Sequence, residues 1–159
     1  MIEINNEFLD EVSGKAKSAA RKRMNFNFHK DMADPLHRMI NALEPGTYVQ
    51  PHKHENPDKI ESFVVLRGRV LVITFTDDGQ IINHSILDPE IGKYGVEIAP
   101  RIFHTIISLM EGSAVYEVKN GPYTPVDDKN FAEWAPKEGS SEAQNYMNSI
   151  LNKLNVKNA

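Results

Sequence analysis

Apolar residues recur with helical spacing near both ends of the chain and with strand spacing between those ends. In residues 6–20, apolar side chains three and four positions apart predict a short helix. Residues 141–154 carry a second apolar stripe with the same spacing, and Ser141 with Gln144 matches a capping box at its start. Each predicted helix therefore has one apolar side that must pack on another part of the fold.

The chain between these helices predicts strands. Residues 24–29 alternate strictly between apolar and polar, so their phenylalanines share one face. Their polar side chains share the other face; these are Asn25, Asn27 and His29. Further apolar segments, separated by turns, predict strands at 38–43, 48–54, 62–66, 70–75, 81–87, 96–98, 104–109 and 114–118. This many short strands indicates an all-β sandwich or closed barrel with short N- and C-terminal helices.

The composition is that of one globular domain. The chain has 159 residues, of which 40% are hydrophobic and 25% are charged, so it can bury a core of ordinary size. We divide it into an N-terminal helical segment (1–23), a barrel (24–125) and a C-terminal extension with a helix (126–159).

Charge and cysteine content exclude several classes of protein. Eighteen Lys and Arg residues against 22 Asp and Glu residues give a net charge of −4, which disfavours a nucleic-acid partner. The absence of cysteine excludes disulfide scaffolds, thiol catalysis, iron–sulfur clusters and Cys-ligated zinc. No secretory signal pattern opens the chain and no apolar run is long enough to cross a bilayer, so we expect a cytoplasmic protein without a membrane partner.

Two histidines one residue apart, His52 and His54, lie in a segment predicted to be extended. Period-2 geometry places both imidazoles on the same face, which is a common beginning of a divalent metal site. Glu61 opens the next apolar strand, and its spacing favours an inward carboxylate. Glu55 and Asp58, in the loop before it, are the alternative carboxylates.

The spacing around these residues resembles the motifs of the cupin superfamily. In the first motif five residues separate a glycine from His-x-His, and six residues separate the glutamate from a second glycine. Gly46 and Gly68 occupy those two positions. The second motif ends in a histidine after a proline-containing turn, here Pro100 and His104, although the usual glycine is absent. The resemblance implies a small jelly-roll barrel that holds one divalent metal through four residues, which are His52, His54, Glu61 and His104.

Six further segments carry a closer resemblance, at 23–29, 43–48, 66–68, 117–119, 121–123 and 131–136. They are similar to WbuC-type cupin metalloproteins, which occur in bacterial surface-polysaccharide (O-antigen) clusters. This resemblance covers most of the chain and implies a single-domain metal-binding cupin.

Three imidazoles and one carboxylate suit Zn, Fe, Mn or Ni better than Cu(I). Four protein ligands on an octahedral ion leave two positions for water or substrate. One carboxylate leaves the site with about one unit of positive charge, which favours an anionic ligand oxygen. We therefore expect a small oxygen-rich anion, such as a sugar acid, a sugar phosphate or a carboxylate metabolite.

Candidate proton carriers follow from strand parity. If Tyr116 and Val118 pack outward, Glu117 and Lys119 point into the cavity as an acid–base pair; the alternative is a salt-bridged surface face. His29 is a third candidate for moving a proton.

Candidate substrate-binding residues come from the same parity and from the turn before His104. The four are Asn25, Asn27, Tyr48 and Arg101. In that turn the guanidinium of Arg101 would lie over the cavity entrance. The remaining histidines, His37 and His84, are interpreted as ordinary surface or strand residues.

These features predict a metal-binding cupin that acts on a small sugar or sugar-nucleotide-derived oxyanion in surface-polysaccharide biosynthesis, with isomerase or epimerase-like chemistry. The alternatives are a non-catalytic small-molecule-binding cupin, an Fe-dependent dioxygenase, and an assembly factor with an incidental metal. We also expect a homodimer, because cupin barrels commonly pair and one barrel leaves part of the stripe at 141–154 uncovered.

Overall fold

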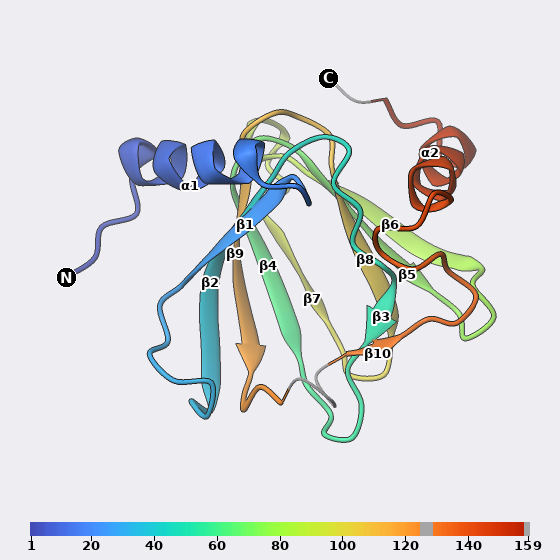
Figure 1. Cartoon of the computed structure of the whole chain (residues 1–159), viewed down its shortest axis with the longest axis horizontal. Helices are drawn as coiled ribbons and strands as arrows, with labels where there is room; N and C mark the ends of the chain where they lie inside the picture. Colours follow the sequence, from blue (N-terminus) through green and yellow to red (C-terminus); the bar gives the residue numbers. More distant parts are fainter. Residues whose placement is uncertain (125–128, 158–159) are drawn as a thin grey trace.

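Two β-sheets form the body of the molecule, and one helix packs on the outer side of each sheet (Figure 1). This computed structural model describes residues 1–124 and 129–157. Within that part of the chain every strand pairing is antiparallel. None of the described helices is long and apolar enough to cross a membrane.

Each sheet has five strands whose spatial order differs from their order in the chain. The first sheet contains, side by side, β1 (Arg23–Asn27), β2 (Leu36–Leu43), β9 (Ser113–Asn120), β4 (Glu61–Arg67) and β7 (Gly95–Ile98). The second contains β10 (Asn130–Phe131), β3 (His52–Lys53), β8 (Phe103–Ser108), β5 (Val70–Phe75) and β6 (Ile81–Leu87). The helices are α1 (Asn6–Ser18) and α2 (Ala143–Lys153), with a short 3-10 turn, η1 (Pro89–Ile91).

This arrangement confirms the predicted all-β cupin-like fold with terminal helices. The predicted boundary between the barrel and the C-terminal extension, at residues 125 and 126, lies outside the described residues.

Apolar side chains form three layers, one between the sheets and one under each helix. The continuous apolar run of β5 follows from this layering, because β5 is buried on both faces. Val70 and Val72 pack into the core between the sheets, whereas Leu71 and Ile73 pack into the layer under α2. The inner core fills part of the space between the sheets.

The predicted N-terminal helix and the first strand pack together as expected. Asn5 caps α1 by accepting a hydrogen bond from the backbone N–H of Phe8 at 3.0 Å. The ring of Phe8 meets that of Phe26 edge-on at 4.9 Å, and Phe28 joins the same layer. The phenylalanine face of β1 therefore points to α1, and the opposite face points between the sheets.

The start of α2 differs from the prediction. The helix begins at Ala143 after Glu142, which makes no side-chain capping bond, and the capping box does not form. The side chain of Gln144 instead donates to Asn148 one turn further on, at 3.2 Å.

The apolar stripe of α2 is buried within the chain itself. Met147, Ile150 and Leu151 pack on the outer face of the second sheet. One subunit thus covers most of the stripe, and Tyr146 and Leu154 are partly buried.

Gly68, between β4 and β5, is a position where only glycine fits. Its φ is +78°, and a Cβ there would lie 2.8 Å from the backbone Cα of Ser113. We expect Gly68→Ala to lower the free energy of unfolding by about 2–4 kcal/mol, measured by urea denaturation, since it adds left-handed strain to a backbone clash. Gly14→Ala is the matched control, because a Cβ at Gly14 meets nothing within 4 Å and alanine favours the helix. Equal stability of the two variants would contradict this account.

Candidate metal centre

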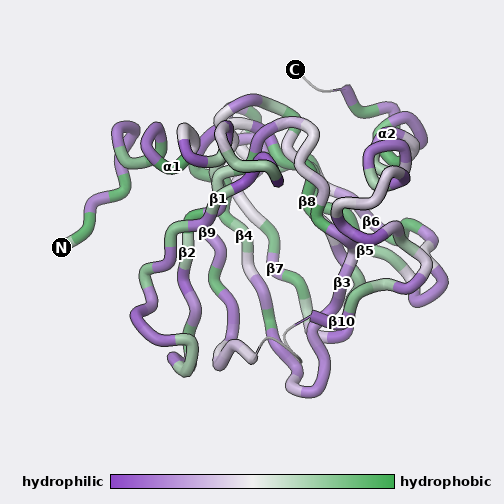
Figure 2. Tube along the Cα trace, viewed as in Figure 1, coloured by the Kyte–Doolittle hydropathy of each residue, from purple (hydrophilic) through white to green (hydrophobic). Residues whose placement is uncertain are grey.

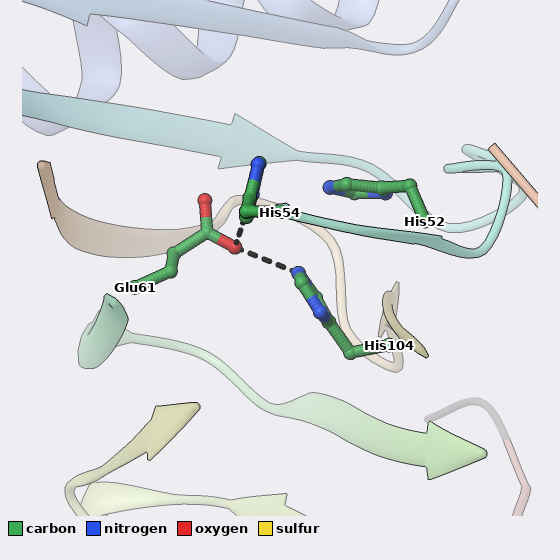
Figure 3. Close-up of side chains that lie close together, drawn as sticks. All are labelled: His52, His54, Glu61 and His104. Carbon is green, nitrogen blue, oxygen red and sulfur yellow. Dashed lines mark hydrogen bonds and ion pairs between the residues drawn. The ribbon is translucent and has the colours of Figure 1, made fainter. Parts of the chain in front are cut away.

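Four side chains from both sheets meet between them (Figure 3). His52 lies on β3, His54 follows that strand, Glu61 is the first residue of β4, and His104 lies on β8. The antiparallel register places His52 directly opposite His104. One ligand atom from each residue lies within 4.8 Å of the others, and all four residues are buried. This group could hold a metal ion.

The polar loop between His54 and Glu61 leaves the motif intact. It is hydrophilic through most of its length (Figure 2). Glu55 pairs with Lys53, at 3.2 Å, on the opposite face of β3, and Asp58 pairs with Arg101 at 2.9 Å. Of the three candidate carboxylates, Glu61 is therefore the one that lies in the group.

Backbone carbonyls orient two of the imidazoles. Nδ1 of His52 donates to the carbonyl of Gln50, and Nδ1 of His104 donates to the carbonyl of Ile102, both at 2.9 Å. Each contact places a hydrogen on Nδ1 and leaves Nε2 facing the group as the ligand nitrogen, the usual outer-shell arrangement of metal-bound histidine. Nε2 of His104 lies 2.8 Å from Oε2 of Glu61.

The ionisation states also suit a divalent cation. Burial lowers the pKa of His52 well below its ordinary value, so its imidazole is neutral. Burial alone would raise the pKa of Glu61, but contacts with His104 and His54 hold that pKa well below its ordinary value. Three imidazoles with an ionised carboxylate form a donor set that fits Zn, Fe, Mn or Ni.

Three residues of the group, His52, Glu61 and His104, form part of the wall of a cavity of about 370 Å³ between the sheets. Glu117 and Lys119 line this cavity too, while Tyr116 faces the opposite way, with its ring 5.7 Å from that of Phe28. The inward interpretation of β9 is therefore confirmed, and the salt-bridged surface face is not what the structure shows. Nζ of Lys119 lies 3.9 Å from a carboxylate oxygen of Glu61 and 3.9 Å from one of Glu117.

Glu117 can carry a proton near neutral pH. Burial, together with the negative charge of Glu61, raises the pKa of Glu117 to about 8, although Lys119 opposes the shift. The side-chain amide of Asn41 donates a hydrogen bond to the carboxylate of Glu117.

The polar face of β1 also lines the cavity, as its alternation predicts. Asn25, Asn27 and His29 all contribute to the wall. The amide of Asn25 donates to the side-chain oxygen of Asn27 at 2.7 Å. These side chains offer amide and imidazole groups to a polar ligand.

Tyr48 does not line this cavity, contrary to the prediction. Its hydroxyl donates to the carbonyl of Pro136 at 2.8 Å, and its ring packs with that of Tyr146 beside α2. The prediction failed because β3 is only His52–Lys53. The residues before it are not in a strand, so period-2 alternation does not extend back to Tyr48.

Arg101 does not lie over the entrance either. It is not among the residues that line the cavity, and its exposed guanidinium forms an ion pair with Asp58. The backbone N–H of Arg101 donates to the carbonyl of His54 at 3.0 Å, which ties the turn to the loop before Glu61.

The sequence did not predict several of the residues that line the cavity, among them His37, Asn41, Arg23 and Lys129. His37 lies on β2, in agreement with its interpretation as a strand residue, but it is buried and lines the cavity. The alternation of β2 was the available signal, because His37 and Asn41 are four positions apart and therefore share one face of the strand. Arg23 donates to the carbonyl of Tyr48 at 2.9 Å and to Glu138 at 2.6 Å, and such distant contacts leave no local signal.

Comparison with solved structures supports the fold. Capsular polysaccharide assembling protein CapF from Staphylococcus aureus is 25% identical, with a TM-score of 0.56 over 69% of this chain and 29% of CapF. KdgF from Halomonas sp. is 16% identical, with a TM-score of 0.50 over 64% of this chain and 82% of KdgF. L-ribose isomerase from Geodermatophilus obscurus is 14% identical, with a TM-score of 0.52 over 78% of this chain and 71% of the isomerase.

Sequence comparison adds a family. No curated protein matches the chain. The family described as Domain of unknown function (DUF6016) matches residues 4–87, which include three of the four residues of the metal-site group. The match covers more than half of the sequence, and the chain belongs to the DUF6016 family.

Proposed function

We propose that this protein is a metal-binding cupin that acts on a small, sugar-derived oxyanion with isomerase or epimerase-like chemistry. One observation carries the proposal. Lys119 lies 3.9 Å from both Glu61, a residue of the metal-site group, and Glu117, in a shared cavity. Proton-carrying side chains therefore adjoin the place where a substrate oxygen would meet the metal.

The metal would be held by His52, His54, Glu61 and His104. Other residues of the cavity would bind the substrate and transfer the proton. The metal supplies Lewis acidity, which makes a C–H bond next to a substrate carbonyl easier to deprotonate. Glu117 takes that proton on its carboxylate and returns it to the other face or the neighbouring carbon. Lys119 holds a substrate oxygen by donating a hydrogen bond, and the amides of Asn25 and Asn27 orient the sugar hydroxyls.

The charges of the cavity favour an anionic substrate. The basic residues Arg21, Arg23, Lys119 and Lys129 line it, against the acidic residues Glu61 and Glu117. A bound divalent metal would add two further positive charges, so the loaded cavity is positive overall. Polar donors around a cation suit oxyanions and polyols, whereas an apolar ligand would leave those donors without partners.

We further propose a role in surface-polysaccharide biosynthesis. The resemblance to WbuC-type cupins supports it, as does the likeness to CapF, a capsular polysaccharide assembling protein. The chain spans less than a third of CapF, so the likeness extends to that part alone. The cytoplasmic location and the homodimer stay predictions; light scattering at high micromolar concentration measures the latter.

Solvent hydrogen exchange tests the proposed chemistry. Metal-loaded protein is incubated in D2O with D-glucose 6-phosphate, D-glucuronate or a 4-keto sugar nucleotide, and proton NMR follows the C–H signals. We expect one sugar C–H signal to disappear only when both protein and metal are present. Binding without exchange would favour the non-catalytic alternative, and consumption of O2 with Fe-loaded protein would favour the dioxygenase.

A further inference from the structure

Two histidines outside the metal-site group form a stacked pair in the same cavity. His29 follows β1 and His37 lies on β2, and their ring centroids are 4.0 Å apart with an angle of 15° between the planes. His29 is 7% exposed and His37 is 2% exposed, yet both line the cavity. Their remaining surface therefore faces the ligand space rather than bulk solvent.

Backbone contacts occupy one nitrogen of each ring. Nε2 of His37 lies 3.1 Å from the carbonyl of Met32 and donates to it. Nδ1 of His29 lies 3.2 Å from both the backbone N–H and the carbonyl of Arg38, and we assign it as the acceptor of that N–H. This leaves Nε2 of His29, with its hydrogen, and Nδ1 of His37 as the nitrogens that can serve a ligand.

The charges that face His37 from the neighbouring elements are mainly cationic. Burial lowers the pKa of His37. The neighbouring imidazole of His29 and the ammonium groups of Lys119 and Lys59 lower it further. Lys119 separates His37 from the nearby carboxylates. Its Nζ lies 3.9 Å from a carboxylate oxygen of Glu61 and 3.9 Å from one of Glu117.

The carboxylates of the loop that joins β1 and β2 accept hydrogen bonds from backbone groups of that loop. Asp31 accepts the backbone N–H of Ala33, and Asp34 accepts that of Lys30. The charges that act most strongly on the pKa of His37 are cationic, so a bound anion would compensate an imidazolium there.

Strand register sets the distance from the pair to the metal-site group. His37 pairs with Lys119 across β2 and β9, and Lys119 pairs with Glu61 across β9 and β4. Two strand spacings separate the backbones of His37 and Glu61 by about 10 Å. One small molecule can therefore place one oxygen near the metal-site group, a second near Lys119, and an anionic group at the imidazole pair.

We propose that His29 and His37 form a subsite for the carboxylate or phosphate group of the ligand, and that the pair takes up one proton from solvent when this group binds. The subsite deepens the proposed function and rests on it, because it fixes which end of the substrate carries the charge. Nε2–H of His29 and the newly protonated Nδ1 of His37 each donate to an oxygen of the anion.

Long-range proton–nitrogen NMR of the zinc-loaded protein tests the proton uptake on the wild-type chain. We expect a neutral imidazole at His37 at pH 7.5 without ligand, and the spectrum of a charged imidazole at His37 with the anionic probe. D-glucuronate and D-glucose 6-phosphate distinguish a carboxylate from a phosphate, and neutral D-glucose is the uncharged control. Imidazoles that stay neutral while an anionic probe is bound would overturn the subsite.

Substitutions that keep the backbone contacts provide the second measurement. His29→Asn retains an acceptor near Nδ1, and His37→Gln retains a donor near Nε2. We expect each change to weaken the affinity for the anionic probe about 10- to 100-fold, as measured by calorimetry. This is the usual contribution of a charge-assisted hydrogen bond. His84→Gln, on the exposed face of β6, is the matched control and should leave affinity unchanged.

The outcomes separate the two proposals. Wild-type affinity in both variants would overturn the subsite and leave the proposed function standing. A metal-loaded wild-type protein that binds neither anionic probe nor a 4-keto sugar nucleotide would overturn both. If a variant fails to fold, the wild-type NMR spectra decide the question without it.

Discussion

Protein with His104→Ala is expected to lose its bound metal, whereas the wild-type chain retains about one divalent ion. His104 is buried and contributes one of the four ligand nitrogens and oxygens that lie within 4.8 Å of one another. Loss of an outer-shell partner costs about 10- to 100-fold in metal affinity, so loss of a direct ligand costs more than about 100-fold. Elemental analysis after dialysis measures the metal content of both proteins.

The same substitution should remove the effect of metal on stability. Metal at about 1,000 times its Kd stabilises the folded state by about 4 kcal/mol, which raises Tm by about 8–16 °C in a protein of this size. A chelator should therefore lower the Tm of the wild-type protein by that amount and leave the Tm of the His104→Ala protein unchanged.

His84→Ala is the matched control, because His84 lies on the exposed face of β6 away from the group. It should retain both the metal and the response to chelator. Full metal content in the His104→Ala protein would show that the four-residue group is not the metal site.

Glu117→Gln is expected to slow the proposed solvent hydrogen exchange by about 10²- to 10⁴-fold, the usual contribution of a positioned general base. The amide occupies nearly the volume of the carboxylate and still accepts the hydrogen bond that Asn41 donates to Glu117. The amide of the glutamine cannot take up a proton from carbon, however. Because Glu117 is not part of the metal-site group, metal content should stay at the wild-type value.

The exchange rate is measured by proton NMR in D2O with metal-saturated protein, and metal content is determined on the same sample. Glu97→Gln, on the exposed part of β7, is the matched control and should exchange at the wild-type rate. An unchanged rate in the Glu117→Gln protein would assign the proton transfer to another group, with Lys119 and His29 as the next candidates in the cavity.

Strand alternation predicted the inward side chains wherever a strand is regular over several residues. Glu61 begins a seven-residue strand with Phe63 and Val65 on its buried side, and Glu117 with Lys119 lies in an eight-residue strand. Alternation failed at Tyr48, because the residues before His52 follow no strand geometry. Periodicity is a property of repeated backbone dihedral angles, and it carries no information beyond the segment that repeats them.

Local order therefore let the sequence predict both helices and most of the strands, although β10 was not predicted and β3 is shorter than the expected strand at 48–54. The resemblance to cupins supplied the four residues of the metal-site group. The tertiary structure alone decided which distant side chains complete the cavity. Register across β2, β9 and β4 aligns His37, Lys119 and Glu61, and Asp58 binds Arg101 at the turn where we expected an open cavity entrance. Such contacts depend on which strands become neighbours and on how loops close, and these are settled by long-range packing that no local pattern records.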